Sequence, residues 1–299
     1  MSTPIIRYEE HSTRLFEIEM AIKFSLSAME TKADSLKGDP KIDAAFAQMG
    51  SGFEKILESV RMDDKDRASA RKAHKSDLNK FKDVALGGFH ARELLLNIGL
   101  VMLCTQLEVF INHLLDVVLA AEPRKILDLA PDKELSAKEV LDLGNYDAVM
   151  QRVRDKIVDE VDRAGTRDKF SKHLGQRFKL IDTSQIRIVP PQGVDPSQFK
   201  DWNIDRLDQV FGERHRIVHR GELLIQDSNY LSLVSLFFKA IQTTLTINAV
   251  RGYPVVLDSR TSAAMALGVA KMLCGFHKSS LKEFEEKTRG MFPLIGAPD

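Results

Sequence analysis

The chain has 299 residues, of which 43% are hydrophobic and 29% are charged, and this globular composition excludes a disordered chain. It contains 43 Lys and Arg against 43 Asp and Glu. The net charge of zero excludes a uniformly basic surface but leaves room for a local basic cleft. Two cysteines, Cys104 and Cys274, exclude a disulfide framework and a multi-cysteine zinc site, and their apolar surroundings are typical of buried thiols.

Helical periodicity dominates the chain, which predicts an all-α fold without a sheet. The only strand-like pieces are Ile186–Val189 and Val255–Leu257. An N-terminal helical region spans 1–88 and ends at Gly87-Gly88, the best candidate for a boundary. Its expected helices lie at about 5–30, 41–61 and 63–83.

A second region, 89–299, opens with a long apolar helix at about 89–121. An insert of shorter helices follows over 124–200. It contains a basic stretch, 163–179, which is more typical of a solvated face, with contact to nucleic-acid phosphates as the alternative. The remainder is expected to form helices at about 201–219, 229–250 and 261–288.

The apolar helix at 89–121 is long enough to cross a membrane, but it carries polar residues that include Asn97, Glu108 and Asp116. Such groups are too costly at a bilayer centre, so we expect a buried helix and no membrane partner. Residues 1–10 lack the apolar core of a secretion signal. These features favour a soluble protein of the cytoplasm.

The most informative stretch for chemistry is residues 213–221, Glu-Arg-His-Arg-Ile-Val-His-Arg-Gly. It concentrates three arginines and two histidines in an otherwise amphipathic helix. Arg214 falls on the apolar stripe of that helix, between Phe211 and Val218. Glu108 interrupts the apolar stripe of the helix at 89–121 in the same way. Because a charge on a core-facing stripe needs a partner, we expect Glu108 to pair with Arg214 and orient it.

Gly221 is suited to end this helix, which places His219 in the last turn. A helix C-terminus favours a charged imidazole, and histidine is suited to proton transfer. His215 lies four residues earlier on the same face. Two histidines at this spacing can also bind a metal, but no third ligand is evident, and we expect neither a metal nor another cofactor.

Arg214, four intervening residues and His219 resemble the R-x(4–6)-H motif of HEPN domains (higher eukaryotes and prokaryotes nucleotide-binding). This spacing also joins Arg67 to His74 and Arg167 to His173, but only the pair Arg214–His219 ends an amphipathic helix and precedes a strongly apolar one. The upstream segment Leu107-Glu108-Val109-Phe110 also looks like the first core helix of this family. The resemblance covers about 89–250.

The resemblance implies an antiparallel helical bundle that dimerises through the motif-bearing helices and cleaves RNA without a metal. In that case the ribose 2′-OH attacks the adjacent phosphate, with His219 as acid or base, His215 as an accessory group and Arg214 stabilising the phosphorane. Arg216 and Arg220 would contact backbone phosphates. The family also suggests a bacterial toxin or antiviral effector, with an antitoxin or other protein as a further partner.

Two other interpretations stay open. A catalytically silent module of the same fold would bind RNA, nucleotides or a protein, and would not need His219. In a helical scaffold, the first 85 or so residues would engage a partner helix. The alternative for Arg214 and His219 themselves is a buried pair that satisfies core hydrogen bonds.

Overall fold

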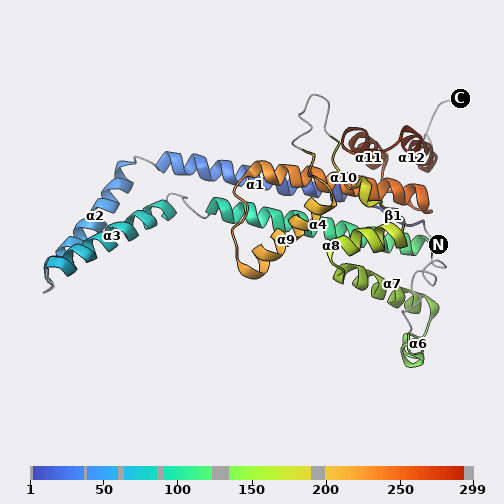
Figure 1. Ribbon diagram of the computed structural model, residues 1–299, viewed down its shortest axis with the longest axis horizontal. Coiled ribbons are helices and arrows are strands. Elements are labelled where there is room, and N and C mark those ends of the chain that lie inside the picture. The colour runs from blue at the N-terminus through green and yellow to red at the C-terminus, as the bar shows by residue number, and fades with distance from the viewer. Residues whose placement is uncertain are drawn as a thin grey trace. The chain divides into compact units, whose positions relative to one another are not determined.

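The computed structural model describes residues 3–36, 39–59, 64–85, 91–122, 135–189 and 199–292, and over these residues the protein is 81% helical (Figure 1). This confirms the all-α class. The longer helices are α1 (Tyr8–Leu36), α2 (Pro40–Ser59), α3 (Asp64–Ala85), α4 (Ala91–Ala121), α7 (Tyr146–Arg163), α9 (Ile204–Arg220), α10 (Ser228–Gly252), α11 (Arg260–Leu273) and α12 (Lys278–Met291). The shorter ones are α6 (Ala137–Leu143), α8 (Thr166–Asp168), the π-helix η1 (Lys169–Arg177) and the 3-10 helix η2 (Thr183–Gln185).

Two predicted helix boundaries were wrong. Residues 5–6 are not the start of the first helix but form β1 (Ile5–Ile6), which pairs in parallel with β2 (Val256–Leu257). The expected single helix at 261–288 is two helices, α11 and α12, which lie side by side in Figure 1. The break follows Cys274, whose backbone is extended, and there the Leu273 carbonyl accepts a hydrogen bond from Val189 N at 2.9 Å. Ile186–Val189 forms no strand.

The described chain divides into two compact units. The first comprises residues 1–19, 100–222 and 229–299, and the second comprises 20–99 and 223–228. These limits fall inside α1 and α4, whereas the predicted boundary at 88 lies outside the described residues. In the second unit α2 pairs with α3 through Arg71 and Glu54, whose Nη2 and Oε2 atoms are 2.8 Å apart, and through a ring stack of Phe53 on His74.

In the first unit the beginning of α1 docks by buried polar contacts. Tyr8 and Thr243 of α10 share a hydrogen bond of 2.7 Å between hydroxyl groups. His11 is 7% exposed, and its Nδ1 atom lies 3.0 Å from Nε2 of Gln106 on α4. Its ring stacks on His113, about two turns further along α4. These contacts fix the N-terminal segment against the helix that carries Glu108.

The two most apolar helices, α4 and α10, are long enough to span a membrane by length and composition. In their most apolar windows, however, 56% and 78% of the residues are buried inside the protein. The core helices of soluble proteins have this property, and the two helices fit that role. Cys104 on α4 and Cys274 after α11 are both buried free thiols, as the sequence predicts.

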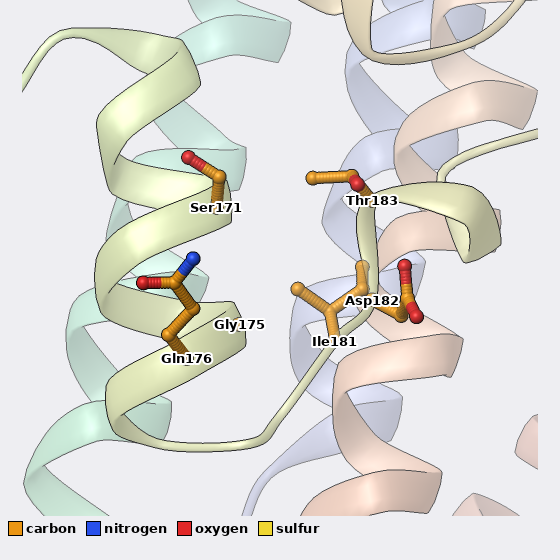
Figure 2. Close-up of a pocket in the computed structure, with 6 residues that line it drawn as sticks. All are labelled: Ser171, Gly175, Gln176, Ile181, Asp182 and Thr183. Atoms are coloured by element: carbon orange, nitrogen blue, oxygen red, sulfur yellow. The ribbon is translucent and has the colours of Figure 1, made fainter.

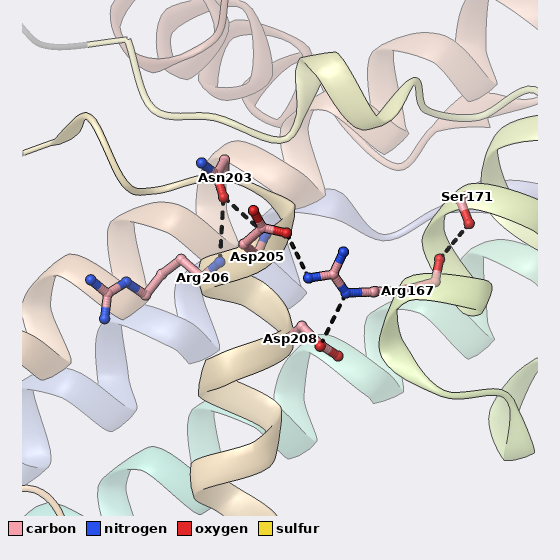
Figure 3. A network of polar contacts seen from close by, with 6 residues as sticks. All are labelled: Arg167, Ser171, Asn203, Asp205, Arg206 and Asp208. Carbon is pink, nitrogen blue, oxygen red and sulfur yellow. Dashed lines mark hydrogen bonds and ion pairs between the residues drawn. The ribbon is translucent and has the colours of Figure 1, made fainter.

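Helix α9, which carries the motif, is fixed at both ends. Its N-cap is Asn203, whose side-chain oxygen accepts a hydrogen bond from Asp205 N at 2.9 Å. In the first turns of α9, Asp205 and Asp208 both pair with Arg167 of α8, at 2.7 and 3.2 Å (Figure 3). The helix ends at Gly221, whose φ of 64° is the left-handed conformation that glycine adopts without strain.

Candidate functional site

The predicted pair of Glu108 and Arg214 is present. Arg214 Nη2 lies 3.5 Å from Glu108 Oε2, and the two side chains are 31% and 23% exposed. The pair is therefore half-buried, and it joins α4 to the C-terminal half of α9. The Arg214 Nε atom is buried and has no hydrogen-bond partner among the described residues. A guanidinium carries five N–H donors, so the ion pair with Glu108 leaves donors such as Nε without a partner among the described residues.

The two histidines of the motif are exposed on the last turns of α9. Their ring centroids are 4.4 Å apart, and the ring planes are inclined by 47°. Neither ring has a hydrogen-bond partner in the part of the chain that the structure describes, so both keep their nitrogens available to solvent. The alternative of a dry, mutually satisfied pair of Arg214 and His219 is wrong for this protein.

Arg214 and His219 do not touch one another in the described residues. They are five residues apart, which is about 140° around a helix, and Arg214 turns toward α4 whereas His219 faces solvent. Val218, expected on the buried stripe, is 50% exposed. The buried positions of α9 are Leu207 and Val210, so the apolar stripe ends before the motif begins.

Arg216 and Arg220, the predicted phosphate contacts, both pair with Glu222, which follows the helix end. Glu222 Oε2 accepts hydrogen bonds from Nε of Arg216 at 2.9 Å and from its Nη2 atom. Its other oxygen, Oε1, lies 3.8 Å from Arg220 Nη1. The Arg216 contact lowers the pKa of the Glu222 carboxyl, and the Glu222 carboxylate raises the pKa of Arg216.

Sequence reasoning missed Glu222 and also Tyr230 near the start of α10. The Tyr230 hydroxyl donates a hydrogen bond of 2.5 Å to Glu213 Oε2, and burial raises the pKa of Tyr230. Glu213 accepts a second hydrogen bond, of 2.9 Å, from Gln209. The position of Glu222 could have been predicted from Gly221, because a left-handed residue after a helix turns the chain back toward the last helical turn.

The motif is thus charge-compensated in the free protein. Glu108 faces Arg214, and Glu222 faces Arg216 and Arg220. The basic stretch at 163–179 is compensated in the same way, but it is only partly the expected solvated face, because Lys169 is 6% exposed. Its ion pairs are Arg163–Asp159, Arg167–Asp205, Lys169–Asp162, Lys172–Asp168 and Arg177–Glu160.

A pocket of about 290 Å³ lies elsewhere, between η1 and the segment that follows it (Figure 2). Its lining residues, none predicted from sequence, are Ser171, Gly175, Gln176, Ile181, Asp182 and Thr183. No motif residue lines it. No group of three or more His, Cys, Asp or Glu side chains that could hold a metal ion occurs among the described residues.

No family model, curated protein or solved structure matches this chain.

Proposed function

We propose that the protein is a metal-independent endoribonuclease of the HEPN type. The single observation that carries the proposal is the state of the motif on α9. The rings of His215 and His219 are exposed, and their centroids are 4.4 Å apart. Arg214 pairs with Glu108 and keeps at least one N–H donor without a partner among the described residues. Reactive groups that are open to solvent yet positioned by a partner are typical of active sites.

The residue types suit cleavage by an internal nucleophile. His219 takes the proton of a ribose 2′-OH, and the 2′-oxygen bonds to the adjacent phosphorus. The phosphorus–5′-oxygen bond then breaks, and an imidazolium donates the proton that the leaving 5′-oxygen needs. The products are a 2′,3′-cyclic phosphate and a 5′-OH. Arg214 stabilises the negative charge of the phosphorane.

In a homodimer, Arg214 of one subunit and His219 of the partner subunit can face the same phosphate, although the two residues lie on different sides of α9 within one chain. In this arrangement the acid is His219 of the partner subunit, and His215 is an accessory group. Exposed apolar residues flank the motif on the two helices that carry it, Val109 on α4 and Val218 on α9, at 45% and 50% exposure. We place these two valines in the interface of a dimer formed through the motif-bearing helices.

The test is incubation of the purified protein with structured RNA in EDTA. We expect fragments ending in a 2′,3′-cyclic phosphate, and no cleavage of 2′-O-methyl RNA, which lacks the nucleophile. His219→Ala should lower the rate about 10²- to 10⁴-fold. Arg214→Ala should lower it about 10²- to 10³-fold.

Binding of RNA without cleavage would instead favour a catalytically silent module of the same class. If wild type and His219→Ala degrade RNA equally, the activity is a contaminant and the nuclease proposal is wrong. The toxin or antiviral setting, a partner protein and the cytoplasmic location belong to the same proposal. A growth defect on expression of wild type but not of His219→Ala would support the toxin setting.

A further inference from the structure

Glu222 pairs with both of the arginines that the sequence predicts to contact phosphates. It follows Gly221 directly, so the turn that ends α9 brings its carboxylate back to the last helical turn. There one carboxylate meets two guanidiniums, those of Arg216 and Arg220, which are four residues apart on the same face. His219 lies three residues after Arg216 and is therefore its neighbour on the helix surface.

The chemistry of this contact matches that of a phosphodiester. Arg216 presents two N–H groups, from Nε and Nη2, to a single carboxylate oxygen. The guanidinium fork binds carboxylates and phosphates with the same geometry, so one can replace the other. The arginine side chains are 48% and 67% exposed, and exposed ion pairs of this kind are weak and readily exchanged.

We propose that Arg216 and Arg220 form a subsite for one backbone phosphate of single-stranded RNA, next to His219, and that Glu222 is its internal competitor. The identity of the ligand as RNA rests on the proposed function. In the free protein the carboxylate fills the subsite. When RNA binds, a phosphate displaces Glu222 and the two arginines change partners without losing their charge compensation.

The experiment measures binding of a labelled 2′-O-methyl RNA strand by fluorescence anisotropy, because this ligand has the RNA backbone but no nucleophile. Glu222→Gln should tighten binding about fivefold at about 50 mM salt. The slope of log K against log salt should become steeper by up to about 0.7, because the displaced Glu222 carboxylate no longer offsets the positive charge that neutralises the bound phosphate.

The chain offers a matched control in Glu283. Its Oε2 atom accepts a hydrogen bond of 2.7 Å from Nε of Arg251 and forms an ion pair of 2.7 Å with Nη2, so it resembles the contact of Glu222 with Arg216. Arg251 lies in the last turn of α10, about 35 Å along this helix from its first residue, Ser228. Glu283→Gln changes the net charge equally and should leave RNA binding as in wild type.

A double variant tests whether the tighter RNA binding of Glu222→Gln arises at the subsite formed by Arg216 and Arg220. Arg216→Ala in the Glu222→Gln background should abolish the increase in affinity and in salt slope. Equal binding by wild type, Glu222→Gln and Glu283→Gln, or equal tightening by both single variants, would overturn the proposal. Because the ligand cannot be cleaved, the outcome is independent of catalysis. Tighter binding confined to Glu222→Gln would support the subsite even if His219→Ala showed that the protein is no nuclease.

Discussion

At the scale of single residues, Arg214 is the side chain whose environment most constrains the chemistry. It is half-buried, one of its nitrogens faces Glu108, and its Nε atom has no partner among the described residues. A buried unsatisfied donor costs stability, which is a common property of active sites. The pair with Glu108 could be predicted because both charges fall at helical spacing from apolar residues in the sequence, although the buried positions of α9 end at Val210.

Glu108→Gln tests the orienting role. The amide keeps the size of the side chain but removes the charge that holds the guanidinium, so RNA cleavage should fall about tenfold. The free energy of unfolding should change by less than about 1 kcal/mol, because the pair is partly solvated. Steady-state kinetics and urea denaturation measure the two effects. Unchanged cleavage would show that Arg214 does not depend on Glu108.

Buried His11 makes the stability of the first unit depend on pH. Burial, and next the neighbouring His113, lowers the pKa of His11 from 6.5 to about 4. As the pH falls, the His11 side chain is protonated in the unfolded chain at a higher pH than in the folded protein. The stability that His11 contributes above pH 6.5 is therefore lost as the pH falls toward 4. The loss from His11 is at most about 3 kcal/mol.

His11→Gln checks this prediction, because glutamine keeps a polar partner for Gln106 but does not titrate. Urea denaturation at several pH values between 7 and 4 should show a smaller loss of stability for the variant than for wild type. Parallel pH profiles for the two proteins would contradict the assignment.

At the scale of elements, sequence periodicity predicted the helix cores well and their ends less well. The apolar stripe of α10 depends only on the spacing of residues within the helix, so the periodicity of the sequence predicts it. The break between α11 and α12 depends on a distant segment: Val189 bonds to Leu273, and a side chain at Gly275 would meet Arg187 at 2.8 Å. Such contacts leave no periodic signal. Glu222 was missed for a similar reason, since a turn rather than a helical spacing brings it to Arg216.

The π-helix η1 provides a test of close packing between elements. A Cβ at Gly175 would lie 3.0 Å from the backbone oxygens of Phe170 and Ile181, which cannot move independently of the chain. Gly175→Ala should therefore destabilise the protein by about 1–3 kcal/mol. At Gly275 the obstacle is the end of the flexible Arg187 side chain, so Gly275→Ala should cost less. A thermal shift assay that ranks the two variants in the opposite order would contradict this packing.

At the scale of the whole molecule, the proposed dimer makes a prediction about Val109 and Val218. Placing a carboxylate at either position would bury a charge in the interface, so Val109→Asp and Val218→Asp should each weaken self-association at least about tenfold. Val140 on α6 is also exposed, at 41%, and Val140→Asp is the matched control. Analytical ultracentrifugation measures the effect. A monomeric wild type at micromolar concentration, or equal dimers in all four proteins, would contradict the proposed interface.

The central claim is that exposed His219 and the Arg214 that pairs with Glu108 together cleave RNA, and the rate of RNA cleavage in EDTA by His219→Ala tests it most directly. His277, an exposed histidine that begins α12 without a side-chain cap hydrogen bond, supplies the matched control. We expect cleavage by wild type and by His277→Ala, and a loss of about 10²-fold or more in His219→Ala. Equal rates for the three proteins, or no cleavage by any of them, would contradict it.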